Sequence, residues 1–308
     1  MALENRTIRV ISLIPSATEI LHCLGGLDAL VGRSHECDFP TVVQSLPICT
    51  APNLDPSGSS AAIHGQVESL LKKALSIYAN DEAQIERLQP THILTQAQCE
   101  VCAVSLTQVE AAVRRLGDST PTLISLQPST VDEVLTDILR VGEVLELPAQ
   151  AAVNRLRDRM QVLRKRVTRT GIPVGCIEWT EPLMAAGNWV PELVSMAGGV
   201  DLLGASGQHS SWLSWEQLQA ANPEVLLVMP CGFDLTATAE AVRSLSQDER
   251  WSQLQAVRSQ QVFLTDGNQY FNRPGPRLVE SLEILIEILQ SCESPQYEQR
   301  GWLRWSEG

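Results

Sequence analysis

Two short apolar segments, each followed within a few residues by cysteine, constrain the fold of this chain more than any other feature. Thr91–Thr95 is predicted to be a strand that runs into a polar turn containing Cys99 and Cys102. Pro223–Met229 repeats the arrangement, because Cys231 follows its end. In an open α/β sheet, ligands bind at the carboxyl ends of the strands. The pattern therefore predicts an α/β protein with functional groups at two strand ends.

Strands and helices alternate along the rest of the chain. Further buried-type strands are predicted at Ile8–Ile14, Ile172–Ile177 and Val262–Thr265, and most segments between them have helical periodicity. Two segments also resemble each other, Glu19–Gly32 and Pro191–Gly204. Both contain a Gly-Gly pair that is followed by one apolar residue and then by aspartate. Repeated βα units of this kind indicate two related α/β halves. A single large α/β domain is the alternative interpretation.

The preferred fold is two Rossmann-like α/β lobes bridged by one long helix. The predicted limits are an N-terminal lobe at 1–127, a connecting backbone helix at 128–148, a C-terminal lobe at 149–292 and a loose tail at 293–308. Asp132 and Glu133 favour the start of the connecting helix, since acidic side chains stabilise a helix N-terminus. Residues 47–64 are rich in Pro, Ser and Gly and are predicted to be loop.

An excess of acidic side chains limits the kinds of molecule that this protein is expected to bind. The chain has 36 Asp and Glu against 23 Lys and Arg, which gives a net charge of −13 at pH 7. This charge disfavours nucleic acid and anionic membrane surfaces but suits a basic protein partner. No apolar run approaches the roughly 18 residues that would span a bilayer. The polar start, residues 1–7, lacks the features of a secretory signal, so a cytoplasmic location is expected.

Four of the eight cysteines fall at predicted strand ends, namely Cys37, Cys99, Cys102 and Cys231. Four thiolates can bind zinc tetrahedrally or hold an Fe–S cluster, which makes a metal site one hypothesis. The opposing interpretation is that each cysteine is a small buried hydrophobic side chain. The CxxC pair also suggests redox chemistry, but the negative charge of Glu100 between the two thiols would raise their pKa and weakens that hypothesis.

Polar and aromatic side chains gather in the predicted strand-end loops. One loop contains His35, Glu36 and Asp38, where a histidine is able to ligate a metal but is equally well a solvated loop residue. The other candidate ligand-binding residues in these loops are Gln98, Glu178, Trp179, Trp212, Asp266, Asn268, Tyr270 and Arg273. Aromatic faces stack on planar macrocycles, whereas their alternative role is core packing. Because GxSxG, P-loop, GxGxxG and HExxH motifs are absent, turnover is not expected.

Several short motifs occur in an order along the chain that indicates a protein family more specifically than any one of the motifs does. They are Ile11–Glu19, Gly32–Pro40, Pro90–Thr95 and Pro223–Met229. Together they resemble the cobalamin and iron-siderophore substrate-binding proteins of ABC importers, over roughly residues 8–290 and most closely in the vitamin B12-binding branch. The segments HECDFP, QCEVCAVS, MPCG and DGNQYFNRPGPRLVE are similar to a signal-less sub-branch described as cobalamin-binding.

The resemblance implies a helical-backbone periplasmic-binding-protein fold, with a ligand such as cobalamin or a related corrinoid in the cleft between the lobes. It also implies an ABC permease as partner, although members of the family are usually exported. Family glutamates that dock to the permease fall near Glu82 and on Glu216, and an aromatic residue that contacts the corrin falls on Met184.

The function expected from the sequence is non-catalytic binding of a metal-bearing small ligand, with a corrinoid preferred. The purpose would be delivery to an ABC importer or intracellular handling. One alternative is a cytosolic cofactor or sensor protein that holds a cysteine-ligated Fe–S cluster or zinc in the same cleft. A weaker alternative is an oxidoreductase that uses the CxxC pair.

Overall fold

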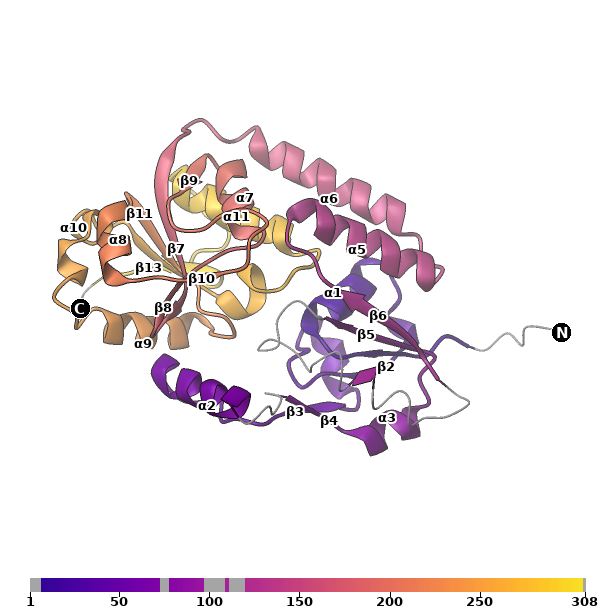
Figure 1. Ribbon diagram of the computed structural model, residues 1–308. Coiled ribbons are helices and arrows are strands. Elements are labelled where there is room, and N and C mark those ends of the chain that lie inside the picture. The colour runs from indigo at the N-terminus through magenta and orange to yellow at the C-terminus, as the bar shows by residue number, and fades with distance from the viewer. Residues whose placement is uncertain (1–6, 73–77, 97–108, 111–119, 307–308) are drawn as a thin grey trace. The chain divides into compact units, whose positions relative to one another are not determined.

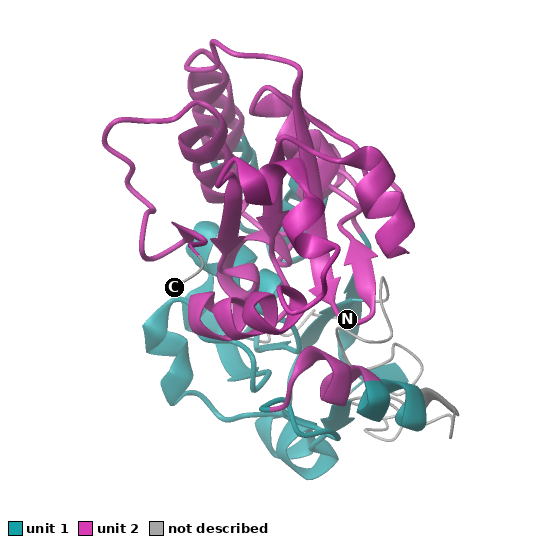
Figure 2. Ribbon diagram, turned by 90° about the vertical axis from the view of Figure 1, so that its left-hand side faces the viewer, with its two compact units in different colours: residues 1–57, 65–127, 135–153 teal, residues 58–64, 128–134, 154–308 magenta. Residues whose placement is uncertain are grey.

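The chain folds as two α/β units, each of which is described by itself (Figures 1 and 2). The computed structural model describes residues 7–72, 78–96, 109–110 and 120–306. Unit 1 comprises Met1–Ser57, Gly65–Gln127 and Leu135–Val153, and unit 2 comprises Gly58–His64, Pro128–Val134 and Asn154–Gly308. The predicted α/β class with two lobes is confirmed, whereas the continuous lobe limits expected from the sequence stay a prediction.

A four-stranded parallel sheet forms the centre of unit 1. Its order is β2–β1–β5–β6, with β1 (Val10–Ser12), β2 (Leu30–Arg33), β5 (His92–Gln96) and β6 (Thr122–Leu126). Because every pairing is parallel, the four carboxyl ends lie at one edge of the sheet. The apolar cluster of this unit includes Ile11, Leu13, Ile85 and Ile93. Strands buried on both faces explain the continuous apolar runs in the sequence.

Two helices of unit 1 show how local sequence sets element limits. α1 (Pro15–Cys23) has proline in its first turn, where a missing amide N–H removes no helical hydrogen bond. The chain then turns at Gly25, whose φ of +74° is a conformation that favours glycine. α3 (Glu82–Leu88) begins after Asp81, whose carboxylate accepts the N–H of Gln84 at 2.9 Å.

A short antiparallel ribbon in unit 1 corrects the prediction that residues 47–64 are loop. β3 (Thr50–Pro52) pairs with β4 (Tyr78–Asn80), so that Thr50 lies opposite Asn80. In addition, α2 (Ser60–Lys72) begins inside the predicted loop. Three-residue strands carry too little periodicity to be recognised in a sequence, and this ribbon forms only because distant segments pair.

Three helices contribute residues to both units. α5 (Val131–Val144) lies at the position of the predicted connecting helix, and α6 (Ala149–Arg164) follows it. Each of them is divided between the units, as is α2. Glu133 fulfils its expected role at the start of α5, because its Oε2 accepts backbone N–H groups of the residues before the helix. Within the described ranges, no helix has the length and apolar character needed to cross a membrane.

Unit 2 is built on a larger mixed sheet of order β10–β8–β7–β11–β12–β13, with β9 paired to β7. The strands are β7 (Ile172–Thr180), β8 (Leu183–Ala185), β9 (Gly199–Asp201), β10 (Ser211–Trp212), β11 (Val225–Val228), β12 (Val262–Thr265) and β13 (Trp302–Arg304). β7, β11 and β12 are parallel, so their carboxyl ends also share one edge. β8 turns back on β7 as an antiparallel neighbour.

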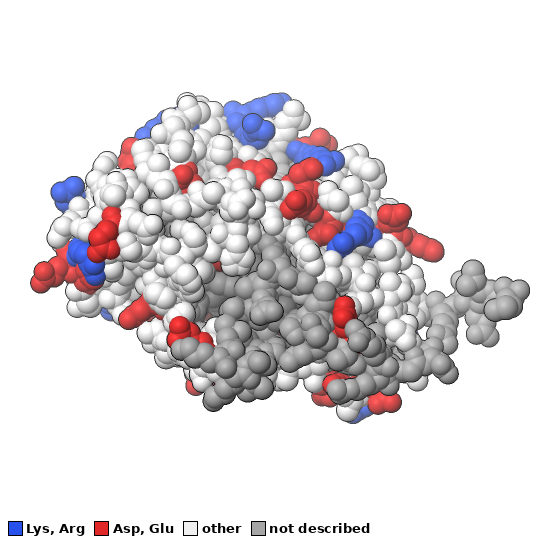
Figure 3. Space-filling model, viewed as in Figure 1, with Lys and Arg blue, Asp and Glu red and all other residues white. Residues whose placement is uncertain are grey.

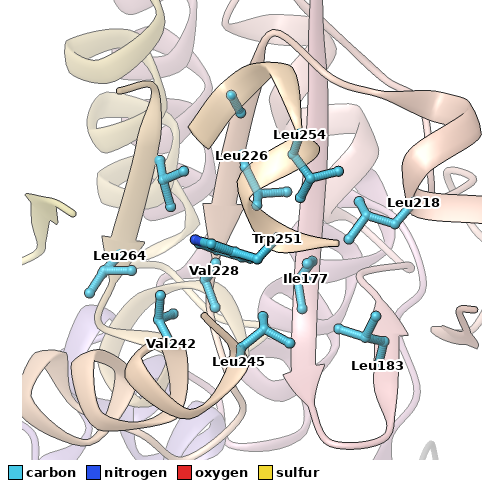
Figure 4. Packing of buried hydrophobic residues seen from close by; sticks show 12 residues of the cluster. Ile177, Leu183, Leu218, Leu226, Val228, Val242, Leu245, Trp251, Leu254 and Leu264 are labelled. Carbon is cyan, nitrogen blue, oxygen red and sulfur yellow. The ribbon is translucent and has the colours of Figure 1, made fainter. Parts of the chain in front are cut away.

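The core of unit 2 is centred on a buried tryptophan, Trp251 (Figure 4). Strand residues such as Ile177 and Val228 pack with it, together with Val242 and Leu245 of a covering helix. The helices of this unit are α7 (Val190–Met196), α8 (Trp215–Ala221), α9 (Leu235–Leu245), α10 (Gln255–Arg258) and α11 (Leu278–Leu289). Large apolar side chains buried in this way provide most of the driving force for folding.

The C-terminal segment is not the loose tail that the sequence predicts. β13 pairs antiparallel with β12, and both Tyr297 and Trp302 are buried. The carboxylate of Glu287 on α11 accepts hydrogen bonds from the backbone N–H of Tyr297 and from Trp302 Nε1, the latter at 2.9 Å. The prediction was wrong because Tyr297 and Trp302, two aromatic residues within a polar segment, donate hydrogen bonds to the buried carboxylate of Glu287. The local sequence around the two aromatic residues does not reveal this acceptor.

Candidate functional site

The first group of candidate residues follows β2 in unit 1. Arg33, the last residue of that strand, is buried, and its guanidinium donates to the carbonyl oxygens of Ser34, Cys37 and Gln44 at 3.0, 3.2 and 3.0 Å. A planar guanidinium with several donors can hold a loop from inside in this way. Arg33 therefore fixes the path of the loop that carries His35, Glu36, Cys37 and Asp38.

His35 is held by the ribbon of β3 and β4. Its Nδ1 lies 2.7 Å from Thr50 Oγ1, and its backbone N–H donates to the same hydroxyl at 3.0 Å. Its ring contacts the Tyr78 ring with centroids 5.2 Å apart. Burial, with the positive charge of Arg33 as a second cause, lowers the pKa of His35 below its usual value of 6.5. The imidazole is therefore neutral near pH 7.

Glu36, Cys37 and Asp38, which follow His35 in the loop, differ in their contacts and in their burial. The hydroxyl of Tyr78 donates to Glu36 Oε1 at 2.9 Å, while Asp38 is half-buried. Cys37 is only 1% exposed, and its Sγ lies 3.1 Å from the hydroxyl of Thr18 on α1. Of the four side chains in this loop, Cys37 is the least accessible to a ligand.

The second group lies at the parallel strand ends of unit 2. The hydroxyl of Ser210 donates to Glu178 Oε2 at 2.8 Å, and the backbone N–H of Cys231 donates to the carbonyl oxygen of Glu178 at 3.3 Å. The Trp179 ring meets Phe233 edge-on with centroids 5.3 Å apart. These contacts join the ends of β7 and β11 into one surface.

The end of β12 adds polar groups to the same edge of unit 2. Asp266 is buried and caps the following turn by accepting the N–H of Gln269 at 2.8 Å, and burial raises the pKa of its carboxyl. Arg273 Nη2 donates to Asn268 Oδ1 at 2.9 Å. Gly267 permits the close approach of the neighbouring loop, because an added Cβ would lie 2.3 Å from the carbonyl oxygen of Pro230.

An aromatic row crosses three strands of unit 2. Met184 on β8 lies directly opposite Trp179 on β7 and Trp212 on β10. Directly opposed residues of antiparallel strands project from the same face, so the three side chains are neighbours. Trp212 is 59% exposed, and its ring meets His64 edge-on with centroids 5.3 Å apart. In the family resemblance, Met184 replaces an aromatic residue that contacts the corrin. The strand register nevertheless places Met184 between two tryptophans.

Two aromatic side chains of unit 2, Tyr270 and Trp189, are buried. Tyr270 is buried, with its ring against Tyr297 and beneath the guanidinium of Arg277, 4.6 Å from the ring centroid. Trp189 is also buried, and its Nε1 donates to the carbonyl oxygen of Phe271 at 2.9 Å. These contacts leave little of Tyr270 exposed, and the expectation that it contacts a ligand stays a prediction.

The cysteine hypothesis gains no support from the described residues. Cys99, Cys102 and Gln98 lie outside them, and Cys37 and Cys231 belong to different units. Within the described part of the chain, no three His, Cys, Asp or Glu side chains are grouped as a metal site.

Each of the two candidate docking glutamates lies in the first turn of a helix. Glu82 and Glu216 are both exposed in the first turns of α3 and α8. Glu216 also forms an ion pair with Arg250 at 3.5 Å, and the Arg250 guanidinium lies 4.9 Å from the Trp215 ring centroid. An exposed pair of this kind contributes little to stability and leaves Glu216 accessible to another cation.

Sequence reasoning missed the residues that orient the candidate side chains. Thr50 and Tyr78 hold His35, Ser210 binds Glu178, and Phe233 supports Trp179. Phe233 directly follows the Pro-Cys-Gly sequence at 230–232, which indicates a turn after the strand. No comparable local signal identifies Thr50 or Tyr78. Their roles depend on pairing across the β3–β4 ribbon.

Comparisons with known proteins agree with this architecture. A vitamin B12-binding protein of Vibrio cholerae is 26% identical over 291 residues, covering 92% of this chain and 90% of the relative. The crystal structure of the periplasmic vitamin B12 binding protein of Vibrio cholerae superposes with a TM-score of 0.63 at 23% identity, covering 92% and 96% of the two chains. A periplasmic heme binding protein from Pseudomonas aeruginosa gives a TM-score of 0.67 at 18% identity, covering 97% and 98%.

The family assignment rests on a match that extends through both units. Residues 10–269 match the periplasmic binding protein family. Proteins of this family bind solutes without catalysing a reaction, which agrees with the absence of enzyme motifs from the sequence. The chain belongs to the periplasmic binding protein family and is a non-catalytic solute-binding protein.

Proposed function

We propose that this protein binds a metal-bearing tetrapyrrole of the corrinoid class for delivery to an ABC importer. The observation that carries the proposal is the aromatic row of Trp179, Met184 and Trp212 at the strand ends of unit 2. Flat aromatic faces and a thioether offer a broad apolar surface on which a planar macrocycle can stack. The relative named as a vitamin B12-binding protein supports the corrinoid class.

Polar groups beside the aromatic row suit the periphery of a corrinoid, which carries amide side chains. Glu178 accepts hydrogen bonds, whereas Arg273 and Ser210 donate them. These residues are already oriented by contacts within unit 2, and pre-oriented groups lose less entropy on binding. A porphyrin presents carboxylates instead of amides, so Glu178 would favour the corrinoid by repelling a porphyrin.

Titration of the purified full chain with cobinamide, cyanocobalamin and hemin tests this function. Tryptophan fluorescence and visible spectra report binding, and a corrinoid is expected to bind more tightly than hemin. Trp212→Ala should weaken corrinoid binding by about 5- to 150-fold, because stacking on an aromatic residue contributes roughly 1–3 kcal/mol in comparable base-stacking sites. Trp305→Ala is the control, since Trp305 follows β13 at the opposite edge of the sheet from β10.

The outcomes separate the ligand classes. Tighter binding of hemin than of either corrinoid would contradict the corrinoid assignment. Failure of all three ligands to bind the folded protein would reject the proposed function. An equal loss of affinity in Trp212→Ala and Trp305→Ala would show that stability, rather than contact with the ligand, explains the effect.

The permease partner is part of the proposal and rests on Glu82 and Glu216. Exposed carboxylates at two helix starts suit arginines of a membrane protein. In vesicles that contain the permease, Glu216→Ala should abolish most ligand uptake while leaving ligand affinity unchanged. Glu293→Ala, another exposed glutamate, is the control. The cytoplasmic location expected from the sequence stays a prediction, which fractionation of cells that express the natural gene would test.

A further inference from the structure

The first turn of α2 belongs to unit 2, although the strands before and after this helix pair with each other in unit 1. β3 and β4 form the ribbon of unit 1, whereas Gly58–His64 is grouped with unit 2 (Figure 2). A short segment separated in this way from its sequence neighbours stays ordered only if it makes contacts of its own. Two such contacts reach residues at or beside the aromatic row of unit 2.

Ser60 makes the first of these contacts. Its hydroxyl lies 2.7 Å from that of Thr180, the last residue of β7, and the two residues are only 4% and 5% exposed. Breaking a buried pair of this kind is costly, because water does not reach the group that is left without a partner. Ile63, in the same turn of the helix, is also buried. Ser60 and Ile63 therefore fix the position of this turn.

His64 makes the second contact. It lies four residues after Ser60, so the two side chains project from the same side of the helix. The half-buried imidazole meets the Trp212 ring with centroids 5.3 Å apart and an angle of 81° between the ring planes. Among the described residues, no other aromatic ring contacts that of Trp212. The turn fixed by Ser60 thus supports Trp212 through the imidazole.

This support matters because Trp212 lies on β10, at the edge of the sheet of unit 2. Its side chain is 59% exposed, and few neighbours restrict its rotamers. A ligand that binds a mobile side chain must order it, whereas a side chain that is already held avoids that entropic cost. The angle of 81° excludes His64 from a flat stack with Trp212. The imidazole therefore supports the indole ring and does not extend the surface on which a macrocycle would lie.

We infer that His64 is a positioning residue of the ligand site, which holds Trp212 for stacking, and that Ser60 positions the helix turn that carries His64. This inference rests on the proposed function, which assigns the aromatic row to a planar ligand. It adds the first turn of α2 to the binding surface. All the residues concerned belong to unit 2.

¹⁹F NMR of the full chain labelled with 5-fluorotryptophan reports on Trp212 before any ligand is added. The Trp212 resonance is the one missing from the Trp212→Phe variant. His64→Ala should narrow this resonance, because the indole ring gains fast motion when its support is removed. His64→Phe keeps an aromatic neighbour and should retain the wild-type linewidth. Ser69→Ala, a change of an exposed residue of α2, is the control.

Affinity for cobinamide and cyanocobalamin, measured on the same variants, tests the role in binding. His64→Ala should weaken binding roughly 2- to 12-fold, which corresponds to about 0.5–1.5 kcal/mol for ordering one side chain. His64→Phe should restore the wild-type affinity. In a Trp212→Ala background, His64→Ala should have no further effect, because no indole ring remains to be positioned.

Ser60 is tested in the same two measurements. Ser60→Ala leaves the Thr180 hydroxyl buried without its partner, and should narrow the Trp212 resonance and weaken binding in the same direction as His64→Ala. Ser60→Ala combined with Thr180→Val replaces both hydroxyls by apolar groups of similar shape, and should recover most of the affinity. Urea denaturation confirms that each variant is folded.

The outcomes separate this inference from the proposed function. Corrinoid binding that is unaffected by His64→Ala overturns the inference, with or without a change in linewidth, and leaves the proposed function intact. Weaker binding without a narrower resonance, or losses that add in the double variant with Trp212→Ala, would show that His64 does not act by positioning Trp212. Failure of the folded wild type to bind cobinamide, cyanocobalamin or hemin rejects the proposed function, and the ligand role of His64 with it.

Discussion

Asp28 and Asp201 occupy the same position in two copies of one short motif, but their environments differ. Asp28 is exposed in a 3₁₀ turn before β2. Asp201 ends β9, and its Oδ1 accepts the backbone N–H groups of Leu203 and Gly204 at 2.9 and 3.2 Å. Its Oδ2 is buried, and this burial raises the pKa of the carboxyl despite those hydrogen bonds.

This difference predicts how stability depends on pH. A carboxyl whose pKa is higher in the folded than in the unfolded protein stabilises the fold fully below its unfolded pKa, near 3.8. That contribution is lost as pH rises through the folded pKa. Asp201→Asn should therefore reduce the decline in unfolding free energy between about pH 4 and 7, measured by urea denaturation. Asp28→Asn is the matched control, and an equal change in both variants would contradict this explanation.

Arg33 provides a second residue-scale prediction. Its buried guanidinium makes several charge-assisted hydrogen bonds to carbonyl oxygens of the His35 loop. Arg33→Met keeps the apolar stem but removes these donors, and should lower the unfolding free energy by about 3 kcal/mol. Arg157→Met removes only an exposed ion pair with Asp132 and should change stability little. Urea denaturation of the two variants measures the difference, and similar values would argue against a structural role for Arg33.

At the scale of elements, Glu287 of α11 links the last strand to the body of unit 2. It is buried and accepts backbone N–H groups of Gln296 and Tyr297 as well as Trp302 Nε1. A buried carboxylate is tolerated when several donors surround it. Glu287 therefore joins α11 both to the segment before β13 and to Trp302 of β13 itself.

Glu287→Gln should loosen this C-terminal segment. The amide N–H₂ would face donors rather than acceptors, so the variant should lose about 2 kcal/mol of unfolding free energy. Limited proteolysis should then cleave within 291–301 at protease concentrations that leave the wild type intact. Glu293→Gln, an exposed change in the same segment, is the control. Unchanged proteolysis in Glu287→Gln would show that aromatic packing alone holds β13.

At the scale of the whole molecule, charge and the shared helices are the main features. Despite the net charge of −13, Figure 3 shows basic side chains gathered over α6 and acidic side chains dispersed across the same face. α2, α5 and α6 each contribute residues to both units. The first turn of α2 is tied to unit 2 by Ser60, whose hydroxyl lies 2.7 Å from that of Thr180.

Ligand binding should raise the stability of the whole chain by mass action. With free cobinamide at about 100 times its dissociation constant, the unfolding free energy should rise by about 2.7 kcal/mol. Thermal unfolding followed by calorimetry measures this effect, with cobinamide concentration as the variable. Trp212→Ala should require a correspondingly higher concentration for the same increase. A melting temperature independent of cobinamide would contradict binding to the folded state.

Sequence patterns alone are enough to assign the class of fold and the edges of the sheets that carry functional groups. A continuous apolar run indicates a buried strand, and the polar residues after it indicate a turn. Both signals lie within a short stretch of sequence, and they therefore identify the loops that contain His35 and Glu178. The order of short motifs likewise indicated the family, because such motifs keep their order when overall identity is low. Gln98, Cys99 and Cys102 lie outside the described residues, so their roles stay predictions.

The contacts of each side chain in those loops depend on the three-dimensional fold. Thr50 reaches His35 through a ribbon of three-residue strands, and strand register places Met184 between Trp179 and Trp212. Glu287 binds Trp302, 15 residues further along the chain, and this contact turns an expected loose tail into a strand. These contacts join residues distant in sequence, and local periodicity carries no information about them. Burial and hydrogen-bond partners, and hence chemistry, depend on that three-dimensional pairing.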